Sequence, residues 1–319
     1  YGVWSLVYYM ISNSAFSVIL FWYFSDWRPK LIFSFQSLKK MFSFGSKLLI
    51  AGLIEAIYKN LYLIVIGKLY SLTELGFYSR ARSIQELPVE NISGVMSRVT
   101  FPVFSYIQKD KNRLKRGLRK SLLNIAMVNF PIMVGLAVIA EPLVQVILTD
   151  KWLPCVPYMQ LLCGAGILIP VNTANLNILK AQGRSDLFLS LTLINKIIII
   201  LSIVITYQWG ITNMIIGQFI AITASYIFNT YFSGKSLRYN FFQQIYDISP
   251  YLFLSIIMGV GIYQLKYIFS NGSSMLLFIQ VISGIIFYGL LCHIFKMSSL
   301  VELCQIIKSK FLSSSITNL

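Results

Sequence analysis

Nearly every stretch between the short polar segments of this 319-residue chain is continuously apolar. Each stretch is about 20 residues long, the length at which an α-helix crosses the hydrocarbon layer of a membrane. A helix also satisfies its backbone hydrogen bonds internally, as lipid requires. Composition agrees, because 56% of the residues are hydrophobic and only 12% are charged, about half of the share usual in soluble domains. The sequence therefore predicts an all-α, polytopic transmembrane helical bundle.

Hydropathy predicts nine membrane spans, and the loops between them alternate in charge. Most of the 27 Lys and Arg residues fall on one side of the membrane, with the densest group between Lys109 and Lys120. The positive-inside rule makes that side cytoplasmic, so we expect residue 1 to lie outside and the C-terminus to lie in the cytoplasm. The predicted spans lie near residues 3–24, 44–66, 84–107, 118–140, 156–180, 187–206, 211–232, 249–269 and 274–295.

The predicted outward loops are short. Residues 207–210 leave room for little more than a turn, and the longest outward segments are 67–83 and 141–155. The second of these is expected to lie at the membrane interface, with Trp152 at the depth of the lipid headgroups. On the cytoplasmic side, segment 25–43 carries aromatic and basic residues, and it is expected either to lie along the inner leaflet or only to tether two bundles.

The residue content argues against several other classes of protein. The net charge of +16 would suit nucleic acid, but the basic residues lie in short loops between apolar spans, so no nucleic-acid partner is expected. The four cysteines show no CxxC spacing, and His293 is the only histidine. Neither a histidine metal cluster nor a Ser-His-Asp triad can be built from such a chain. We therefore expect no metal, no cofactor and no enzymatic activity.

Ionisable side chains interrupt two of the spans, 44–66 and 84–107. The first contains Lys47, Glu55 and Lys59, which a helical rotation of about 100° per residue places on one face. An ionised group at the centre of a bilayer costs at least ~2.5 kcal/mol. This face must therefore meet protein, water or a charged ligand.

The second charged span contains Glu86, Glu90 and Arg98 on an arc of about 120°. Two adjacent spans with inward-facing charges predict a water-filled, charged cavity. Cations in such a cleft offset the cost of drawing an anion from water, while carboxylates there could carry protons.

The alternative is that these charges only neutralise one another as packing pairs, as Glu55 and Lys59 could at i,i+4 spacing. The candidate substrate-binding residues are Lys47, Lys59, Arg98 and Lys196, and the candidate ion-coupling residues are Glu55, Glu86 and Glu90.

Two further polar features lie in apolar spans. Lys196 is expected either to reach the cavity or to extend toward an interface. Asn172, Asn175 and Asn177 follow Pro170, and we expect them to make polar contacts between helices.

Several short motifs occur in order along the chain. They are Phe44-Gly45-Ser46-Lys47, Ile66-Gly67-Lys68-Leu69, Leu75-Gly76-Phe77-Tyr78-Ser79-Arg80-Ala81, Phe101-Pro102-Val103-Phe104-Ser105, Ala140-Glu141-Pro142-Leu143 and Lys151-Trp152. In their order and spacing these motifs resemble the polysaccharide transporter family, and the resemblance extends from about residue 1 to 240. Members of that family flip polyprenyl-diphosphate-linked sugar repeat units in bacteria, and they share a superfamily with multidrug/toxin extruders and peptidoglycan lipid flippases.

The resemblance implies an architecture of two six-helix lobes with an added pair of helices. By that pattern, residues 1–24 are the last helix of a first lobe that is mostly missing, and 25–43 is the inter-lobe linker. Residues 44–232 are then the second six-helix lobe, and 233–319 hold two additional helices and a cytoplasmic tail. Because the chain begins with Tyr1 and lacks a signal-peptide n-region, it is expected to be N-terminally truncated.

The resemblance also implies a function, namely flipping lipid-linked oligosaccharide across the bacterial inner membrane by alternating access. The diphosphate and sugars would enter a partly cationic cavity between the lobes, in contact with membrane lipids. A polysaccharide polymerase and glycosyltransferases would be partners. The alternatives are a multidrug/toxin extruder, which would have a smaller and more acidic or aromatic pocket, a polytopic polysaccharide polymerase or ligase, and a non-transporting scaffold.

Overall fold

The computed structural model describes residues 4–26, 28, 33–268 and 273–301. The chain divides into two compact units, Tyr1–Ser43 and Phe44–Leu319. The first unit contains α1 (Trp4–Phe24), which confirms the predicted span 3–24. It also contains the beginning of α2 (Phe35–Lys59), so the predicted linker 25–43 becomes helical at Phe35.

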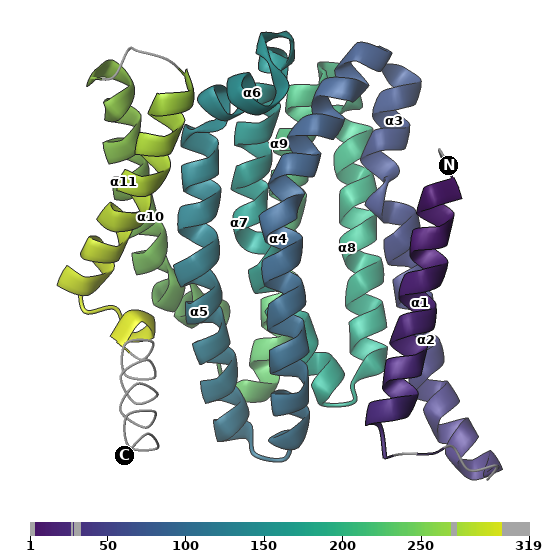
Figure 1. Ribbon diagram of the computed structural model, residues 1–319. Coiled ribbons are helices and arrows are strands. Elements are labelled where there is room, and N and C mark those ends of the chain that lie inside the picture. Colours follow the sequence, from purple (N-terminus) through teal and green to yellow (C-terminus); the bar gives the residue numbers. More distant parts are fainter. Residues whose placement is uncertain (1–3, 27, 29–32, 269–272, 302–319) are drawn as a thin grey trace. The chain divides into compact units, whose positions relative to one another are not determined.

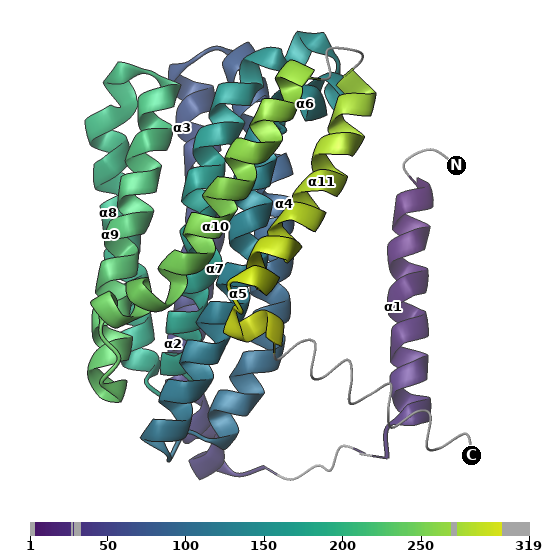
Figure 2. The same ribbon diagram turned by 90° about the vertical axis from the view of Figure 1, so that its left-hand side faces the viewer.

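The second unit is a bundle of long helices that run side by side, with the short α6 lying across one end (Figures 1 and 2). Helix α7 is central and packs against α4, α5 and α9, while α10 packs against α5 and α11. No strand occurs among the described residues. After α2, the elements are α3 (Leu61–Leu69), α4 (Leu72–Tyr106), α5 (Lys111–Val138), α6 (Ala140–Leu148), η1 (Asp150–Cys155), α7 (Val156–Ala181), α8 (Ser185–Thr206), η2 (Tyr207–Trp209), α9 (Ile211–Leu237), α10 (Phe241–Ile268) and α11 (Ser273–Ile294).

Within the described part of the chain, eight helical segments are long and apolar enough to cross a membrane, which supports a multi-pass membrane protein. The ninth predicted span, 84–107, is part of α4. That helix is not among the eight, since it carries Arg82, Glu86, Glu90 and Arg98 along its length. It nevertheless packs along α7 inside the bundle.

The predicted outward loop 67–83 is wrong, because α3 and α4 are joined by only Tyr70 and Ser71. Ser71 begins α4 with a capping box: the Glu74 backbone N–H donates to Ser71 Oγ at 3.2 Å, and the Ser71 N–H donates to Glu74 Oε2 at 3.2 Å. These bonds satisfy backbone donors that a helix start leaves free. The remainder of the segment is therefore helical: Lys68 lies on α3, and Glu74, Arg80 and Arg82 lie on α4.

The predicted interfacial segment 141–155 forms α6 and η1 in place of a loop. Trp152 of η1 packs edge-to-face on Phe77 of α4, with ring centroids 5.9 Å apart. The guanidinium of Arg80 lies 5.6 Å from the centre of the Trp152 ring. Through these contacts Trp152 packs η1 against the first turns of α4.

The asparagines of α7 make the expected polar contacts between helices. Asn175 donates to Gln244 of α10 at 3.0 Å, and Asn177 donates to Ser97 of α4 at 2.8 Å. A side-chain amide of α9 donates to Asn172 at 3.1 Å. These bonds tie three neighbouring helices to α7 at buried and part-buried positions, where an unmade hydrogen bond would be costly.

Candidate functional site

The predicted span 44–66 is interrupted at Asn60, which separates α2 from α3. A helix end leaves backbone carbonyls without intrahelical partners. At this break the Nη2 group of Arg82 donates a 2.6 Å hydrogen bond to the carbonyl oxygen of Lys59. Arg82, which belongs to α4, therefore stabilises the end of α2.

Two ion pairs join the same region. Lys59 Nζ lies 2.5 Å from Glu90 Oε1, and Arg82 Nε lies 2.6 Å from Glu86 Oε1. We call these four side chains the charged cluster. Their partners differ from the pairs considered from the sequence, because Lys59 reaches across to α4 instead of pairing with Glu55. The side chain of Glu55 lies outside the described residues.

The charged cluster lines a pocket of about 280 Å³ between the α2–α3 break and α4. Arg82 is largely buried, with 11% of its side chain exposed, whereas Lys59 and Glu90 are about half exposed. Arg82 Nη1 is buried without a hydrogen-bond partner among the described atoms. The pocket is thus charged, and its lining holds two cations and two carboxylates. The lining residues are Lys59, Asn60, Leu63, Ser79, Arg82, Ser83, Glu86, Leu87 and Glu90.

The other candidate residues do not line this pocket. Arg98 lies eight residues beyond Glu90 on α4, about 12 Å along a helix, and is exposed, with no ion pair to a described side chain. Lys47 is partly buried on α2, and Lys196 is partly buried on α8.

Sequence analysis missed Arg82, because the residue fell in the predicted loop 67–83. Two signals could have found it: the Ser71 and Glu74 capping box, which starts a helix well before residue 82, and the i,i+4 spacing of Arg82 and Glu86.

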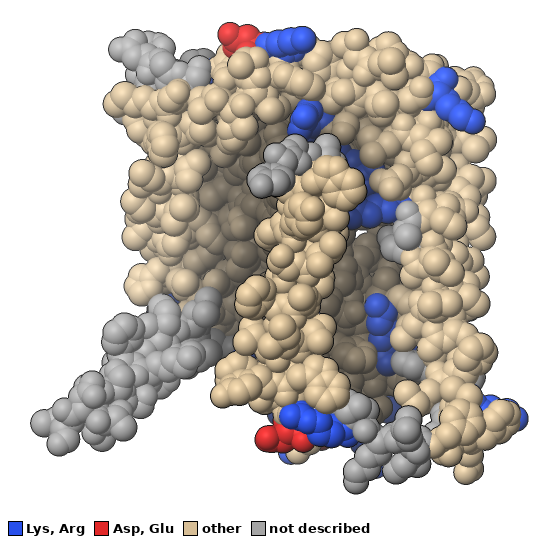
Figure 3. Space-filling model, turned by 45° about the vertical axis from the view of Figure 1, so that its right-hand side comes forward, with Lys and Arg blue, Asp and Glu red and all other residues tan. Residues whose placement is uncertain are grey.

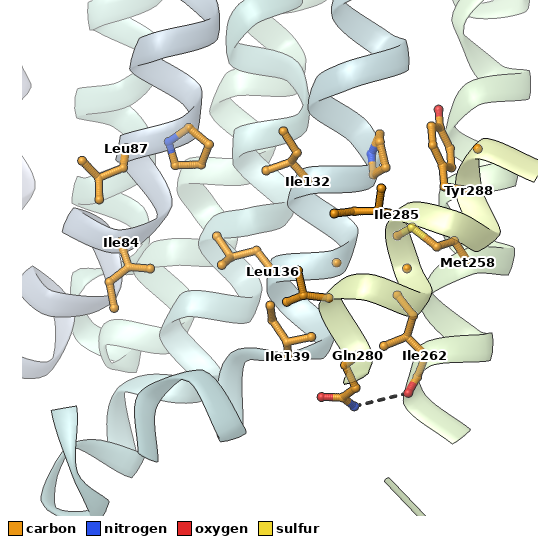
Figure 4. A pocket seen from close by; sticks show the side chains of 16 residues that line it. Ile84, Leu87, Ile132, Leu136, Ile139, Met258, Ile262, Gln280, Ile285 and Tyr288 are labelled. Atoms are coloured by element: carbon orange, nitrogen blue, oxygen red, sulfur yellow. Dashed lines mark hydrogen bonds between the residues drawn. The ribbon is translucent and has the colours of Figure 1, made fainter. Parts of the chain in front are cut away.

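An apolar groove of about 480 Å³ lies on another side of α4, between α4, α5, α10 and α11. Figure 4 shows Ile84 and Leu87 of α4 on one side and Ile285 and Tyr288 of α11 on the other. Leu87 lines both this groove and the charged pocket. A polar and an apolar recess therefore adjoin at one residue.

The space-filling view in Figure 3 shows where charged side chains lie on one face of the molecule. Basic side chains lie at both ends of the molecule in Figure 3, and some lie part-way along the helices among uncharged residues. Cations at mid-helix depth are costly in lipid unless they meet polar groups.

The sequence of this chain is similar to those of known polysaccharide biosynthesis proteins. Residues 1–157 match the family model described as "Polysaccharide biosynthesis protein". The chain is 32% identical to the teichuronic acid biosynthesis protein TuaB of Bacillus subtilis over 53% of its own length and 35% of that protein. It is 31% identical to the lipopolysaccharide biosynthesis protein WzxC of Escherichia coli over 61% of its own length and 40% of that protein.

Among solved structures, the fold matches the lipid II flippase MurJ in an inward closed conformation. The TM-score is 0.66 at 17% identity, covering 83% of this chain and 56% of MurJ. The comparisons confirm the predicted resemblance to polysaccharide transport proteins and the polytopic helical fold. The chain spans less than half the length of the two sequence relatives named here.

Proposed function

We propose that this chain is part of a flippase that carries polyprenyl-diphosphate-linked oligosaccharide across the bacterial inner membrane for surface polysaccharide synthesis. The observation that carries the proposal is the junction at Leu87, where a charged pocket adjoins an apolar groove. A substrate with a charged head and a long apolar tail requires both environments. The proposal is also supported by the names of similar proteins: TuaB and WzxC are biosynthesis proteins for teichuronic acid and lipopolysaccharide, and MurJ is a lipid II flippase.

The charged cluster suits the head of such a substrate. A diphosphate would compete with Glu90 for Lys59 and with Glu86 for Arg82. Charge-assisted hydrogen bonds of arginine to phosphate are among the strongest in proteins. The buried, unpartnered Nη1 of Arg82 is a further donor for an entering anion.

Glu86 and Glu90 give the pocket a means of switching. Protonation of either carboxylate would release a cation for the diphosphate, and loss of that proton would return the cation to its ion pair. Binding of substrate and of a coupling ion would then favour different states, as alternating access requires. Arg98 and Lys47, which lie beyond this pocket, would contact more distant parts of the head.

The apolar groove suits the prenyl tail. Its lining is almost wholly aliphatic and aromatic, with Gln280 as its one amide side chain, and that amide donates its hydrogen bond to Ile262 O at 3.3 Å (Figure 4). An isoprenoid tail in this groove would meet mainly apolar side chains. Gln280 Oε1 and the Tyr288 hydroxyl, which have no hydrogen-bond partner among the described atoms, are polar atoms of residues in its lining.

In this proposal residues 44–232 form one lobe, 233–319 an additional helix pair and tail with a cytoplasmic C-terminus, and 1–43 the connection to another lobe. Transport needs a second lobe to move against the first. The protein acts as a transporter and not as an enzyme. Glycosyltransferases would supply its substrate, and a polysaccharide polymerase would consume it.

The second candidate function is multidrug extrusion. One observation favours it: the charged pocket contains two carboxylates, whereas the family resemblance implied a partly cationic cavity. Anionic side chains are suited to cationic drugs.

One experiment separates the two functions. The whole protein is expressed in its native cells with either Lys59→Ala or Arg82→Ala. Lys68→Ala on α3 serves as a control outside the pocket. A flippase should lose surface polysaccharide in the first two strains while lipid-linked intermediate accumulates. Unchanged polysaccharide together with increased drug sensitivity would replace the flippase by the extruder.

A further inference from the structure

A second basic pocket, of about 340 Å³, lies at the opposite end of the bundle from α6. It is formed between the first turns of α5 and the short segment that follows α11, which lie side by side in Figures 1 and 2. The lining residues are Arg116, Arg119, Lys120, Leu123, Asn124, Ser298 and Ser299.

One wall of this basic pocket is held in place by hydrogen bonds to the largely buried carboxylate of Asp247. Arg119 Nη2 donates to Asp247 Oδ1 at 2.7 Å, and only 9% of the Asp247 side chain is exposed. Tyr239 donates to the other carboxylate oxygen at 2.6 Å. Burial and the charge of Asp247 raise the pKa of Tyr239, so this hydroxyl stays a donor. Arg119 is therefore fixed at the rim before any ligand arrives.

The facing wall is fixed as well. Ser299 is buried, and its hydroxyl lies 2.9 Å from the hydroxyl of the buried Tyr251 on α10. Ser298 beside it is exposed. The basic pocket thus lies between an anchored guanidinium and two serine hydroxyls.

The charge of the basic pocket is uneven. Arg116, Arg119 and Lys120 share one face of α5 by i, i+3 and i+4 spacing. None of the described lining residues is a carboxylate, and Asp247 lies behind Arg119. These four described side chains carry three positive charges and one negative charge. The positive-inside rule explains basic residues at this end of the helices, but it does not require a walled pocket with an anchored arginine.

An apolar side chain lines this pocket, and exposed apolar residues precede its two serines along the chain. Leu123 lines the basic pocket itself, and Ile294 and Phe295 at the end of α11 are both well exposed. In a phospholipid the phosphate lies between the water and the acyl chains, so this combination matches a lipid better than a free anion. Basic pockets between transmembrane helices on the cytoplasmic side bind anionic lipid headgroups.

We propose that the basic pocket formed by Arg116, Arg119, Lys120 and Ser298 binds the phosphate of an anionic phospholipid from the adjacent leaflet. The lipid would bridge α5 and the segment after α11. This site is separate from the charged pocket at Lys59, and the inference does not depend on the transported substrate.

The test is lipid retention by the purified, delipidated full-length protein, measured by native mass spectrometry with phosphatidylglycerol and with zwitterionic phosphatidylcholine. Arg116→Gln combined with Lys120→Gln removes two charges and keeps the Arg119–Asp247 pair. The matched control, Lys109→Gln combined with Lys111→Gln, removes two exposed charges outside the lining. One cation near a membrane surface changes affinity about fivefold.

The pocket variant should therefore retain phosphatidylglycerol roughly 30-fold less well, with the control close to the parent protein. Ser298→Asp, which adds a carboxylate and keeps every cation, should also weaken retention. Equal losses in pocket and control variants, equal binding of phosphatidylcholine, or displacement of the lipid by equimolar inorganic phosphate would each overturn the proposal. Unchanged thermal unfolding of each variant shows that the fold is intact.

Discussion

Lys59 Nζ lies 2.5 Å from Glu90 Oε1, which joins the last residue of α2 to the middle of α4. Both side chains are about half exposed to the pocket. An ion pair this accessible contributes little to stability, because water and salt screen it. It can therefore exchange partners at little cost, which is what a site that admits a charged substrate requires.

That screening gives the first prediction. In a double-mutant cycle with Lys59→Ala and Glu90→Gln, the coupling free energy should be below about 1 kcal/mol. Thermal or denaturant unfolding of the purified protein measures it. In cells, by contrast, Lys59→Ala should strongly reduce surface polysaccharide. A coupling of several kcal/mol would indicate a structural clasp and would count against a ligand-exchanging pair.

The second prediction concerns Arg82, which is far less exposed than Lys59. Arg82→Ala leaves Glu86 and the Lys59 carbonyl without their donor, so unfolding free energy should fall by about 1 to 3 kcal/mol. Arg82→Lys should restore only part of it, since an ammonium cannot reach both acceptors in fork geometry. The control Arg98→Ala, on the same helix and exposed, should change stability by less than about 0.5 kcal/mol.

The third prediction is pH dependence of transport. Glu86→Gln and Glu90→Gln keep the shape of each side chain but cannot titrate, so transport by these variants should depend less on pH than transport by the parent protein. Flux of labelled lipid-linked oligosaccharide in vesicles, at several values of pH, measures it. Parallel pH profiles for all three proteins would exclude both carboxylates as coupling groups.

The sequence predicted the fold well where hydropathy decides it, and poorly where charge interrupts it. The apolar stretch at α1 was correctly placed, whereas the start of α4 was missed, because Arg80 and Arg82 resembled loop residues. The Ser71 capping box is a local signal that a helix begins there, but the charges of Arg80 and Arg82 favoured the prediction of a loop.

The site was only partly predictable for a different reason. Lys59, Glu86 and Glu90 were singled out because charges in a span need partners, but the partner of Lys59 lies 31 residues away on another helix. Side-chain spacing within one helix cannot reveal such a pair. The shared position of Leu87 between two recesses likewise follows only from how α4 packs on α3 and α5 and faces α11 across the groove.

The fourth prediction tests orientation. In a background without reactive native cysteines, Gln208→Cys in the η2 turn should react with an impermeant thiol reagent added outside intact cells. Lys109→Cys, before α5, should react only after the cells are opened. Both positions are exposed. The opposite pattern would reverse the topology inferred from the distribution of Lys and Arg.

The last prediction separates the apolar groove from general packing. Ile285 and Phe278 both lie on α11 and are both well exposed, but only Ile285 lines the groove. Ile285→Trp adds an indole to the space that a prenyl chain would occupy, so it should reduce surface polysaccharide. Phe278→Trp, a comparable enlargement outside the groove, should not. Each protein should unfold at nearly the parent temperature, because exposed apolar positions tolerate added volume better than a packed core does. If both variants transport normally, the tail travels by another path and the proposed role of the groove is wrong.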